Sequence, residues 1–203
     1  LNGVGSGTKI ENIYVLESAD DAIEFFGGTV NVTNLLAVNP DDDMFDFTQG
    51  YSGTLKNCYG VWENGYTSTE ADPRGIEADG NLDGDYSDHL RQSDFTVENM
   101  TIVNNAANTT DNVDRMQDVI KIRRGAKATI TNALVKGSGG TIDLIDMNDS
   151  KDAGNAASSI SITHTLNFKN KLNGTLNTFT EPTTNTGADA SLFTWSGYDF
   201  SSL

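Results

Sequence analysis

Residues 79–88 carry oxygen-bearing side chains at alternate positions, in the order Asp-Gly-Asn-Leu-Asp-Gly-Asp-Tyr-Ser-Asp. Alternating carboxylate and amide oxygens with glycine at the sharp turn are typical of the first half of an EF-type calcium loop. Leu90 stands where that loop has its closing glutamate, so Asp88 would close a shorter loop. The pattern predicts a Ca²⁺ site, and the alternative is a solvated acidic insertion. The candidate ligands are Asp79, Asn81, Asp83, Asp85 and Asp88.

A second candidate site consists of charged residues that recur at one offset in successive short apolar runs. If these runs stack, carboxylates and basic side chains become neighbours on one exposed face. A polysaccharide lyase needs such a face, because carboxylates hold a cation that neutralises the uronate and a base removes the adjacent proton. The alternative, which we favour, is a charge ladder in which opposite signs relieve repulsion. The residues at the offset are Glu24, Asp46, Glu77, Lys121 and Asp143, with Asp79 and Arg123 two positions later; the catalytic candidates are Asp46, Glu77, Lys121 and Arg123.

Trp62 and Tyr66 lie in an aromatic-rich insertion and are candidate ligand-binding residues. Exposed rings offer flat apolar area with a polar edge, which suits stacking on sugars. Packing of the insertion onto the coil is the alternative that we favour, because large aromatic residues are mostly buried.

Further acidic clusters occur at 20–21, 41–43 and 146–152. Aspartate commonly caps turns through local backbone hydrogen bonds, and we expect that role here. A shared cation site among these residues is the alternative. The two histidines, His89 and His164, lack the spacing of zinc ligands.

An asparagine recurs in the pattern apolar-polar-Asn-apolar along the chain. The first three copies are 22 and 23 residues apart, at 12, 34 and 57. We expect stacked coils in which each Asn amide bonds to the Asn above and below, and His164 to replace an Asn in a sixth copy. The other two copies contain Asn99 and Asn132.

Short runs that follow the asparagine runs alternate between apolar and polar residues, and several end in glycine. Period two with one apolar face predicts strands. Connections are too short for crossover helices, and an antiparallel sandwich would not explain the repeated Asn offset. We therefore predict an all-β fold of about six stacked parallel coils, with an internal Asn ladder and long loops on one side. The predicted inward pairs are Ile23/Phe25, Phe45/Phe47, Ile76/Ala78, Ile120/Ile122 and Ile142/Leu144.

The predicted boundaries are residues 1–168 for the stacked coils and 169–203 for a C-terminal capping segment of the same domain. We expect Phe193 and Trp195 to fold over the C-terminal end of the coil. No equivalent cap precedes Thr8, so the N-terminal end would meet further coils upstream or a neighbouring chain. Leu1 in place of an initiator Met indicates a processed product or an interior piece.

Composition limits the partners. Thirteen basic and 29 acidic residues give the 203-residue chain a formal charge of −16. That charge leaves no basic patch to release counterions from a nucleic acid, and no apolar run is long enough for a membrane span. We expect neither. Cys58, the only cysteine, lies at an apolar position and is predicted to be a buried thiol.

The pattern of runs resembles that of right-handed parallel β-helix proteins of the pectate-lyase-like group. Segments 3–8, 20–31 and 41–53 are more closely similar to secreted bacterial β-helix lipoproteins and surface proteins whose function is not known. The resemblance covers roughly residues 3–145. It implies a secreted or outer-surface location and further coils upstream, and it transfers no catalytic residue.

Three functions are compatible with these patterns. The first is a non-catalytic scaffold, secreted or on the cell surface, that binds Ca²⁺ and an extracellular polysaccharide. The second is a calcium-dependent polysaccharide lyase or hydrolase. The third is a structural unit that stacks end to end.

Overall fold

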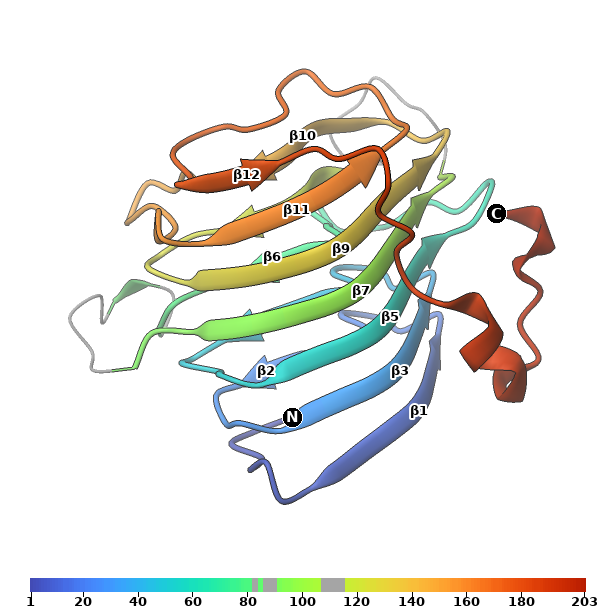
Figure 1. The fold of residues 1–203 in the computed structure, drawn as a ribbon, viewed down its shortest axis with the longest axis horizontal. Helices are drawn as coiled ribbons and strands as arrows, with labels where there is room; N and C mark the ends of the chain where they lie inside the picture. Colours follow the sequence, from blue (N-terminus) through green and yellow to red (C-terminus); the bar gives the residue numbers. More distant parts are fainter. Residues whose placement is uncertain (82–83, 86–90, 107–115) are drawn as a thin grey trace.

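The computed structural model describes residues 1–81, 84–85, 91–106 and 116–203. Its strands form two sheets, and all neighbouring strands within each sheet are parallel. Figure 1 shows the strands of the long sheet rising from β1 at the bottom to β12 at the top. From β1 to β10 the chain alternates between the sheets, so each of these coils adds one strand to each sheet. This arrangement confirms the predicted all-β fold with parallel sheets.

The long sheet has the order β1-β3-β5-β7-β9-β11-β12, and the short sheet has the order β10-β8-β6-β4-β2. The long-sheet strands are β1 (Lys9–Leu16), β3 (Asn31–Val38), β5 (Thr54–Trp62), β7 (Asp94–Asn104), β9 (Lys127–Gly137), β11 (Ser159–His164) and β12 (Thr178–Thr180). The short-sheet strands are β2 (Glu24–Phe26), β4 (Phe45–Thr48), β6 (Ile76–Ala78), β8 (Met116–Ile122) and β10 (Thr141–Asp146).

Apolar residues fill the space between the sheets and stack in register. In the long sheet Val32 pairs with Leu55, Leu55 with Val97, and Val97 with Ile130, and all four side chains are fully buried. The rings of Phe47 and Phe95 stack with their centroids 4.0 Å apart. Stacked strands place like residues about 4.8 Å above one another, so one core runs along the coil axis.

Each repeated asparagine bends its long strand. The backbone φ of these residues lies between 52° and 57°, in the left-handed region that Asn tolerates better than most residues. The Asn34 side chain donates to Asn12, Asn57 to Asn34, and Asn132 to Asn99, over 2.8–2.9 Å. The repeated residue therefore has a backbone role and a side-chain role.

The prediction that His164 replaces an Asn in the next coil is wrong. His164 pairs with Val135, and β11 has a bulge between Ile160 and Ile162. One residue of β11 thus faces two of β9, which moves His164 three positions beyond Asn132. The Asn132 side-chain oxygen instead accepts from the backbone N–H of Thr186, over 2.8 Å.

The long connections do not share one side, contrary to the prediction. The chain leaves the long sheet at the carboxyl ends of β5 and β7 on its way to β6 and β8, whereas it leaves β6 for β7 at the opposite corner. Because parallel strands all run the same way, successive connections must alternate between the two corners.

Residues 169–180 extend both sheets at the C-terminal end. Asn170 and Asn173 form parallel bridges with Asp143 and Asp146, and β12 then pairs with β11. Among the described residues, no helix has the length and apolar character that a membrane span requires.

Residues 186–203, here called the C-terminal strap, lie along the outer face of the long sheet (Figure 1). The prediction that Phe193 and Trp195 cover the C-terminal end is therefore wrong. Several outward-facing residues in the second halves of β3, β5 and β7 are apolar, and Phe193 packs with them in a second, smaller core. The strap includes the 3₁₀ helices η2 (Ala190–Ser196) and η3 (Phe200–Ser202). Residues of this second core are Leu36, Val38, Tyr59, Val61, Val103, Ala188 and Phe193.

Candidate cation site

Three carboxylates meet on the outer face of the short sheet. Asp46 lies on β4 and pairs in register with Glu77 on β6, and Asp43 precedes β4 at the corner of the coil. One carboxylate oxygen from each residue lies within 4.8 Å of the others. Asp43 and Asp46 are only 3% and 8% exposed, and the Glu77 side chain is 13% exposed. The sheet thus gathers acidic groups with little access to water.

Two carboxylate oxygens of this group have no hydrogen-bond partner. They are Oδ1 of Asp43 and Oδ1 of Asp46, and both atoms are buried. Burial raises the pKa of both carboxyls well above the ordinary aspartate value, and repulsion from Glu77 raises it further. A buried unpaired carboxylate is costly, so this group must hold either protons or a cation.

The acidic cluster extends toward the N-terminal end. Asp21 and Glu24 form a second group with Asp46, and Asp20, Asp21 and Asp42 form a third. Burial and repulsion from neighbouring carboxylates raise the pKa of Asp21 and of Asp42 to about 7. Among the ion pairs of the described residues, none involves Asp21, Asp42, Asp43 or Asp46.

Basic side chains neutralise the part of this face nearer the C-terminal end. Arg74 pairs with Glu77, and Lys121 with Asp146. Arg123 binds Glu77 over 2.5 Å and Asp79 over 2.9 Å. Basic residues therefore bind carboxylates around β6, β8 and β10, although Asp118, Asp143 and Asp146 form a further carboxylate group there. The carboxylates around β2 and β4 have no such partners among the described ion pairs.

All four catalytic candidates lie on this face. Register pairs link Asp46 to Glu77 and Glu77 to Lys121, as the repeated offset predicted. Lys121 pairs with Asp146 instead of Asp143, because Ile145 is in register with Ile120. The prediction that Asp143 shares the column is therefore wrong: Asp143 faces Asp118 and accepts from the Asn170 side chain over 2.7 Å.

The predicted calcium loop is described only in part, and Asp83, Asp88 and His89 lie outside the described residues. Asp79 is bound by Arg123 and also lies 3.3 Å from the Arg124 guanidinium. The Asn81 side chain donates to the Arg91 carbonyl over 2.9 Å, and Asp85 pairs with Lys151 over 3.0 Å. In Asp79 and Asp85, basic side chains therefore engage carboxylate oxygens that a cation would need.

Trp62 and Tyr66 pack the insertion onto the coil, the alternative favoured by sequence. Trp62 is fully buried, and its indole N–H donates to the Pro40 carbonyl over 3.0 Å. The Tyr66 hydroxyl donates to the same carbonyl over 2.9 Å. Trp62 has no ring face free for a sugar, so its predicted ligand-binding role is wrong.

Asp43 was expected to cap a turn, with a shared cation site as the alternative. Its N–H donates to Asp21 over 2.9 Å, yet its own Oδ1 has no partner. Two features of the sequence together indicate this site. A run of aspartates lies at a corner of the coil, and an outward-facing acidic residue, Asp46, follows three positions after Asp43.

Two parallel sheets wound into one coil, with aligned residues along its axis, define a parallel β-helix. The family model described as "Pectate-lyase like beta helix domain" matches residues 1–197. The chain belongs to this family. No curated protein and no solved structure matches it significantly.

Proposed function

We propose that this protein is a non-catalytic β-helix scaffold that binds a divalent cation, Ca²⁺, through Asp43 and Asp46, beside Glu77, whose two carboxylate oxygens are bound by Arg74 and Arg123. The observation that carries the proposal is the pair of buried, unpartnered carboxylate oxygens within the three-carboxylate group. Calcium takes six to eight oxygen ligands in flexible geometry. The carboxylates would supply part of this set and water the remainder.

The chemistry of the donors favours calcium over transition metals. Histidine and cysteine, which zinc and copper prefer, are missing from the group. Magnesium demands near-ideal octahedral geometry and gives up its water reluctantly. A carboxylate group of variable oxygen spacing therefore suits Ca²⁺ best.

A secreted or cell-surface location is part of the proposal. Weak calcium sites are filled only where Ca²⁺ is abundant, as it is outside cells. The formal charge of −16 and the resemblance to secreted β-helix proteins support this location. An extracellular polysaccharide is proposed as the partner because it is a common ligand class at that location.

A lyase or hydrolase activity has less support. Lys121 and Arg123 would have to act on a substrate, but both are engaged with carboxylates of the same face. Their side chains are 11% and 13% exposed. These contacts favour a role in neutralising the sheet face.

We also infer that the coil is right-handed, with about six turns and the asparagine column as its internal ladder. Parallel crossovers are right-handed in nearly all proteins. Six long strands, β1 to β11, follow one another in the sheet, and the Asn34–Asn12, Asn57–Asn34 and Asn132–Asn99 hydrogen bonds support the ladder.

The proposed site is tested by calcium titration of the unmodified protein and of the variant Asp46→Asn. Calcium should raise the melting temperature of the unmodified protein, because binding adds about 2.7 kcal/mol to the free energy of unfolding when the calcium concentration is 100 times Kd. Asp46→Asn should lose most of this gain, yet in EDTA it should be at least as stable as the unmodified protein, because a buried carboxyl becomes a neutral amide. Asp94→Asn, at a half-exposed position on β7, is the matched control and should respond to calcium normally. A protein indifferent to both calcium and EDTA would refute the proposal.

A further inference from the structure

Asparagine is followed directly by glycine at three places in the chain. In such a pair the glycine backbone nitrogen can attack the side-chain amide carbon of the asparagine, because glycine has no Cβ to obstruct the approach. Ammonia leaves, a succinimide ring forms, and water then opens the ring to give aspartate or isoaspartate. The reaction needs a glycine N–H that is free to lose its proton and an asparagine side chain that is free to turn toward it. The three pairs are Asn2-Gly3, Asn64-Gly65 and Asn173-Gly174.

The pair Asn2-Gly3 is protected at its nitrogen. The Gly3 N–H donates to the Phe26 carbonyl over 2.9 Å, and Asn2 forms a parallel bridge with Phe26. Attack by the Gly3 nitrogen would break this hydrogen bond, so we expect no reaction in the folded protein.

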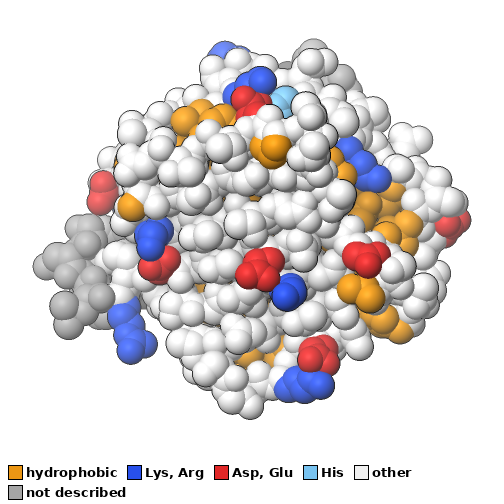
Figure 2. Space-filling model, viewed as in Figure 1, with side chains coloured by type: hydrophobic (Ala, Val, Ile, Leu, Met, Phe, Trp, Pro, Cys, Tyr) orange, Lys and Arg blue, Asp and Glu red, His pale blue; other side chains and the backbone are white. Residues whose placement is uncertain are grey.

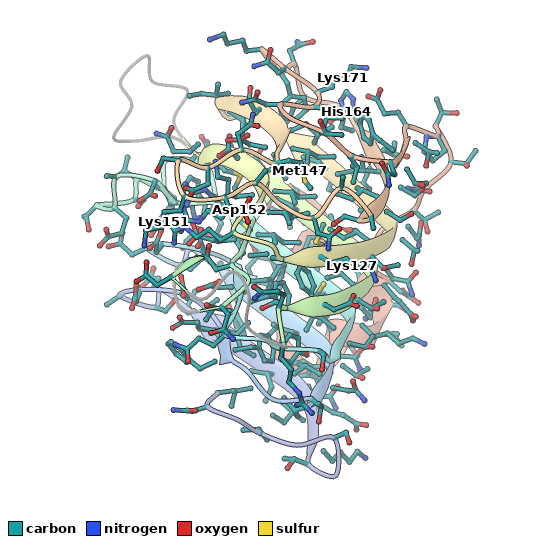
Figure 3. The ribbon with its side chains drawn as sticks, turned by 90° about the vertical axis from the view of Figure 1, so that its left-hand side faces the viewer. Lys127, Met147, Lys151, Asp152, His164 and Lys171 are labelled. Carbon is teal, nitrogen blue, oxygen red and sulfur yellow. The ribbon has the colours of Figure 1, made fainter. Side chains whose placement is uncertain are left out.

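The pair Asn173-Gly174 is protected at its side chain. The Asn173 side-chain oxygen accepts from Asn148 over 2.8 Å, and its nitrogen donates to Asp143 over 3.3 Å. Met147, labelled in Figure 3, donates its N–H to the Asn173 carbonyl over 2.8 Å. These contacts hold both the amide and the backbone, so the side chain is not free to reach the Gly174 nitrogen.

The pair Asn64-Gly65 has neither kind of protection. Both residues are exposed, in a turn that is closed by a hydrogen bond of 3.1 Å from the Tyr66 N–H to the Glu63 carbonyl. Within the described part of the chain, neither the Asn64 side chain nor the Gly65 N–H has a hydrogen-bond partner. A Cβ built on Gly65 would meet no atom within 4 Å, so the surroundings of the turn are open.

The turn adjoins a residue that ties the C-terminal strap to the coil. One carboxylate oxygen of Glu63 accepts from the Tyr198 hydroxyl over 2.8 Å, and the other accepts from the Asn39 side chain over 2.9 Å. Isoaspartate at position 64 would lengthen the main chain by one methylene group and place a second carboxylate beside Glu63. Both changes act against the contact between Glu63 and Tyr198.

We propose that Asn64 deamidates spontaneously in the folded protein, and that the isoaspartate product loosens the strap at Glu63. A bond forms between the Gly65 nitrogen and the Asn64 side-chain carbon as the bond from that carbon to Nδ2 breaks. The proton from the Gly65 nitrogen leaves with Nδ2 as ammonia, and the water that opens the ring supplies the new carboxylate oxygen. No oxidant or reductant is needed. The turn lies outside the proposed cation site, and the reaction does not depend on that site.

Mass spectrometry of protein aged in mildly alkaline buffer tests the modification. Peptides that contain Asn64 should gain the mass difference between an amide and an acid and should separate into aspartate and isoaspartate forms. Asn2 and Asn173 serve as internal controls and should stay unconverted while the protein is folded. In urea all three should react at similar rates, because the fold provides the protection. An unconverted Asn64, or equal conversion of the three residues in folded protein, overturns the proposal.

Limited proteolysis of the same aged samples tests the effect on the strap. Aged unmodified protein should lose residues 186–203 faster than aged Asn64→Gln, which keeps an amide in the turn but closes the ring far more slowly. Tyr198→Phe removes the hydroxyl that donates to Glu63 and should show the faster cleavage without ageing. Circular dichroism checks that both variants are folded. Equal cleavage of aged unmodified protein and aged Asn64→Gln overturns the proposed link to the strap.

Discussion

Asn57 combines a left-handed backbone with two side-chain hydrogen bonds. Its φ is 55°, its amide donates to Asn34 over 2.8 Å, and its oxygen accepts from the Asp189 N–H over 2.7 Å. The sequence predicted the position from the repeated offset, but the strap contact could not be predicted, because nothing in residues 186–203 indicates which part of the sheet they cover.

The variant Asn57→Ala tests both roles. It should lower the free energy of unfolding by about 2–4 kcal/mol, since it loses two hydrogen bonds and strains a left-handed residue. Asn57→Gly loses the same bonds but accepts the backbone conformation, so it should be about 1 kcal/mol more stable than Asn57→Ala. Urea denaturation measures the difference, and equal stabilities would argue against the backbone role.

Asp118 gives a pH-dependent contribution to stability. Burial, with repulsion from Asp146 and Asp143, raises its pKa to about 6, although Lys121 and Arg74 oppose the shift. The folded protein therefore binds a proton more tightly than the unfolded chain, so this contribution falls as the pH rises from about 4 through 6. Asp118→Asn should flatten that part of the melting-temperature profile.

Asp94→Asn serves as the control for this profile. Its side chain is 56% exposed, and the substitution should leave the slope between pH 4 and 6 close to that of the unmodified protein. A slope unchanged by Asp118→Asn would show that Asp118 does not titrate in this range.

At the scale of elements, the alternation of apolar and polar residues predicted most of the inward-facing residues of the short sheet. It did not predict the register in which every pair of strands aligns. Phe25, Phe45, Phe47, Ile120 and Ile122 are buried in the core as predicted. In β10 the offset counted from Gly140 placed Asp143 in the outward column, whereas pairing of Ile145 with Ile120 puts Asp146 there. Glycine marks a corner, but packing of the apolar residues decides the register.

The position of the C-terminal strap could not be predicted from the alternation of apolar and polar residues alone. Outward positions of a sheet are usually polar, yet here Leu36, Val38 and Val61 face outward and are fully buried. Figure 2 shows charges of both signs interspersed over the same view of the molecule, with apolar side chains gathered at its right-hand side, over the strap. The apolar residues at outward positions of β3 and β5 were the feature of the sequence that indicated a covering segment.

Phe193→Ala tests how the strap is held. Phe193 is fully buried, with ring centroids 6.2 Å from Tyr59 and 5.8 Å from Phe200. Removing the ring costs up to about 3–5 kcal/mol locally, so residues 186–203 should become sensitive to proteases while the coil stays folded. Leu192→Ala, at a residue that is 48% exposed, should leave cleavage unchanged. Equal cleavage in both variants would contradict this account.

At the scale of the whole molecule, repetition made the fold predictable. Stacked coils repeat one set of environments, so a residue type recurs at one offset and its position can be read from the sequence. The acidic cluster was only partly predictable, because it joins corner residues to strand residues of two coils and its burial depends on how the corners fold. Asp43 and Asp46 show this, since the sequence places both but does not indicate that they are buried.

In the folded coil, the excess negative charge is concentrated at particular positions. Much of the excess acidity near the first coils lies on Asp21, Asp42, Asp43 and Asp46, none of which forms an ion pair within the described part of the chain. A cation bound by Asp43 and Asp46 would reduce the repulsion among these carboxylates.

The most direct test of the cation site is a crystal of the protein soaked in Tb³⁺, which replaces Ca²⁺ and scatters anomalously. The account predicts an anomalous peak beside the carboxylates of Asp43 and Asp46, about 2.3–2.6 Å from their oxygens. Crystals of Asp46→Asn should lose that peak and keep any others. No peak among these carboxylates, or a peak only in the loop of residues 79–88, would contradict the account.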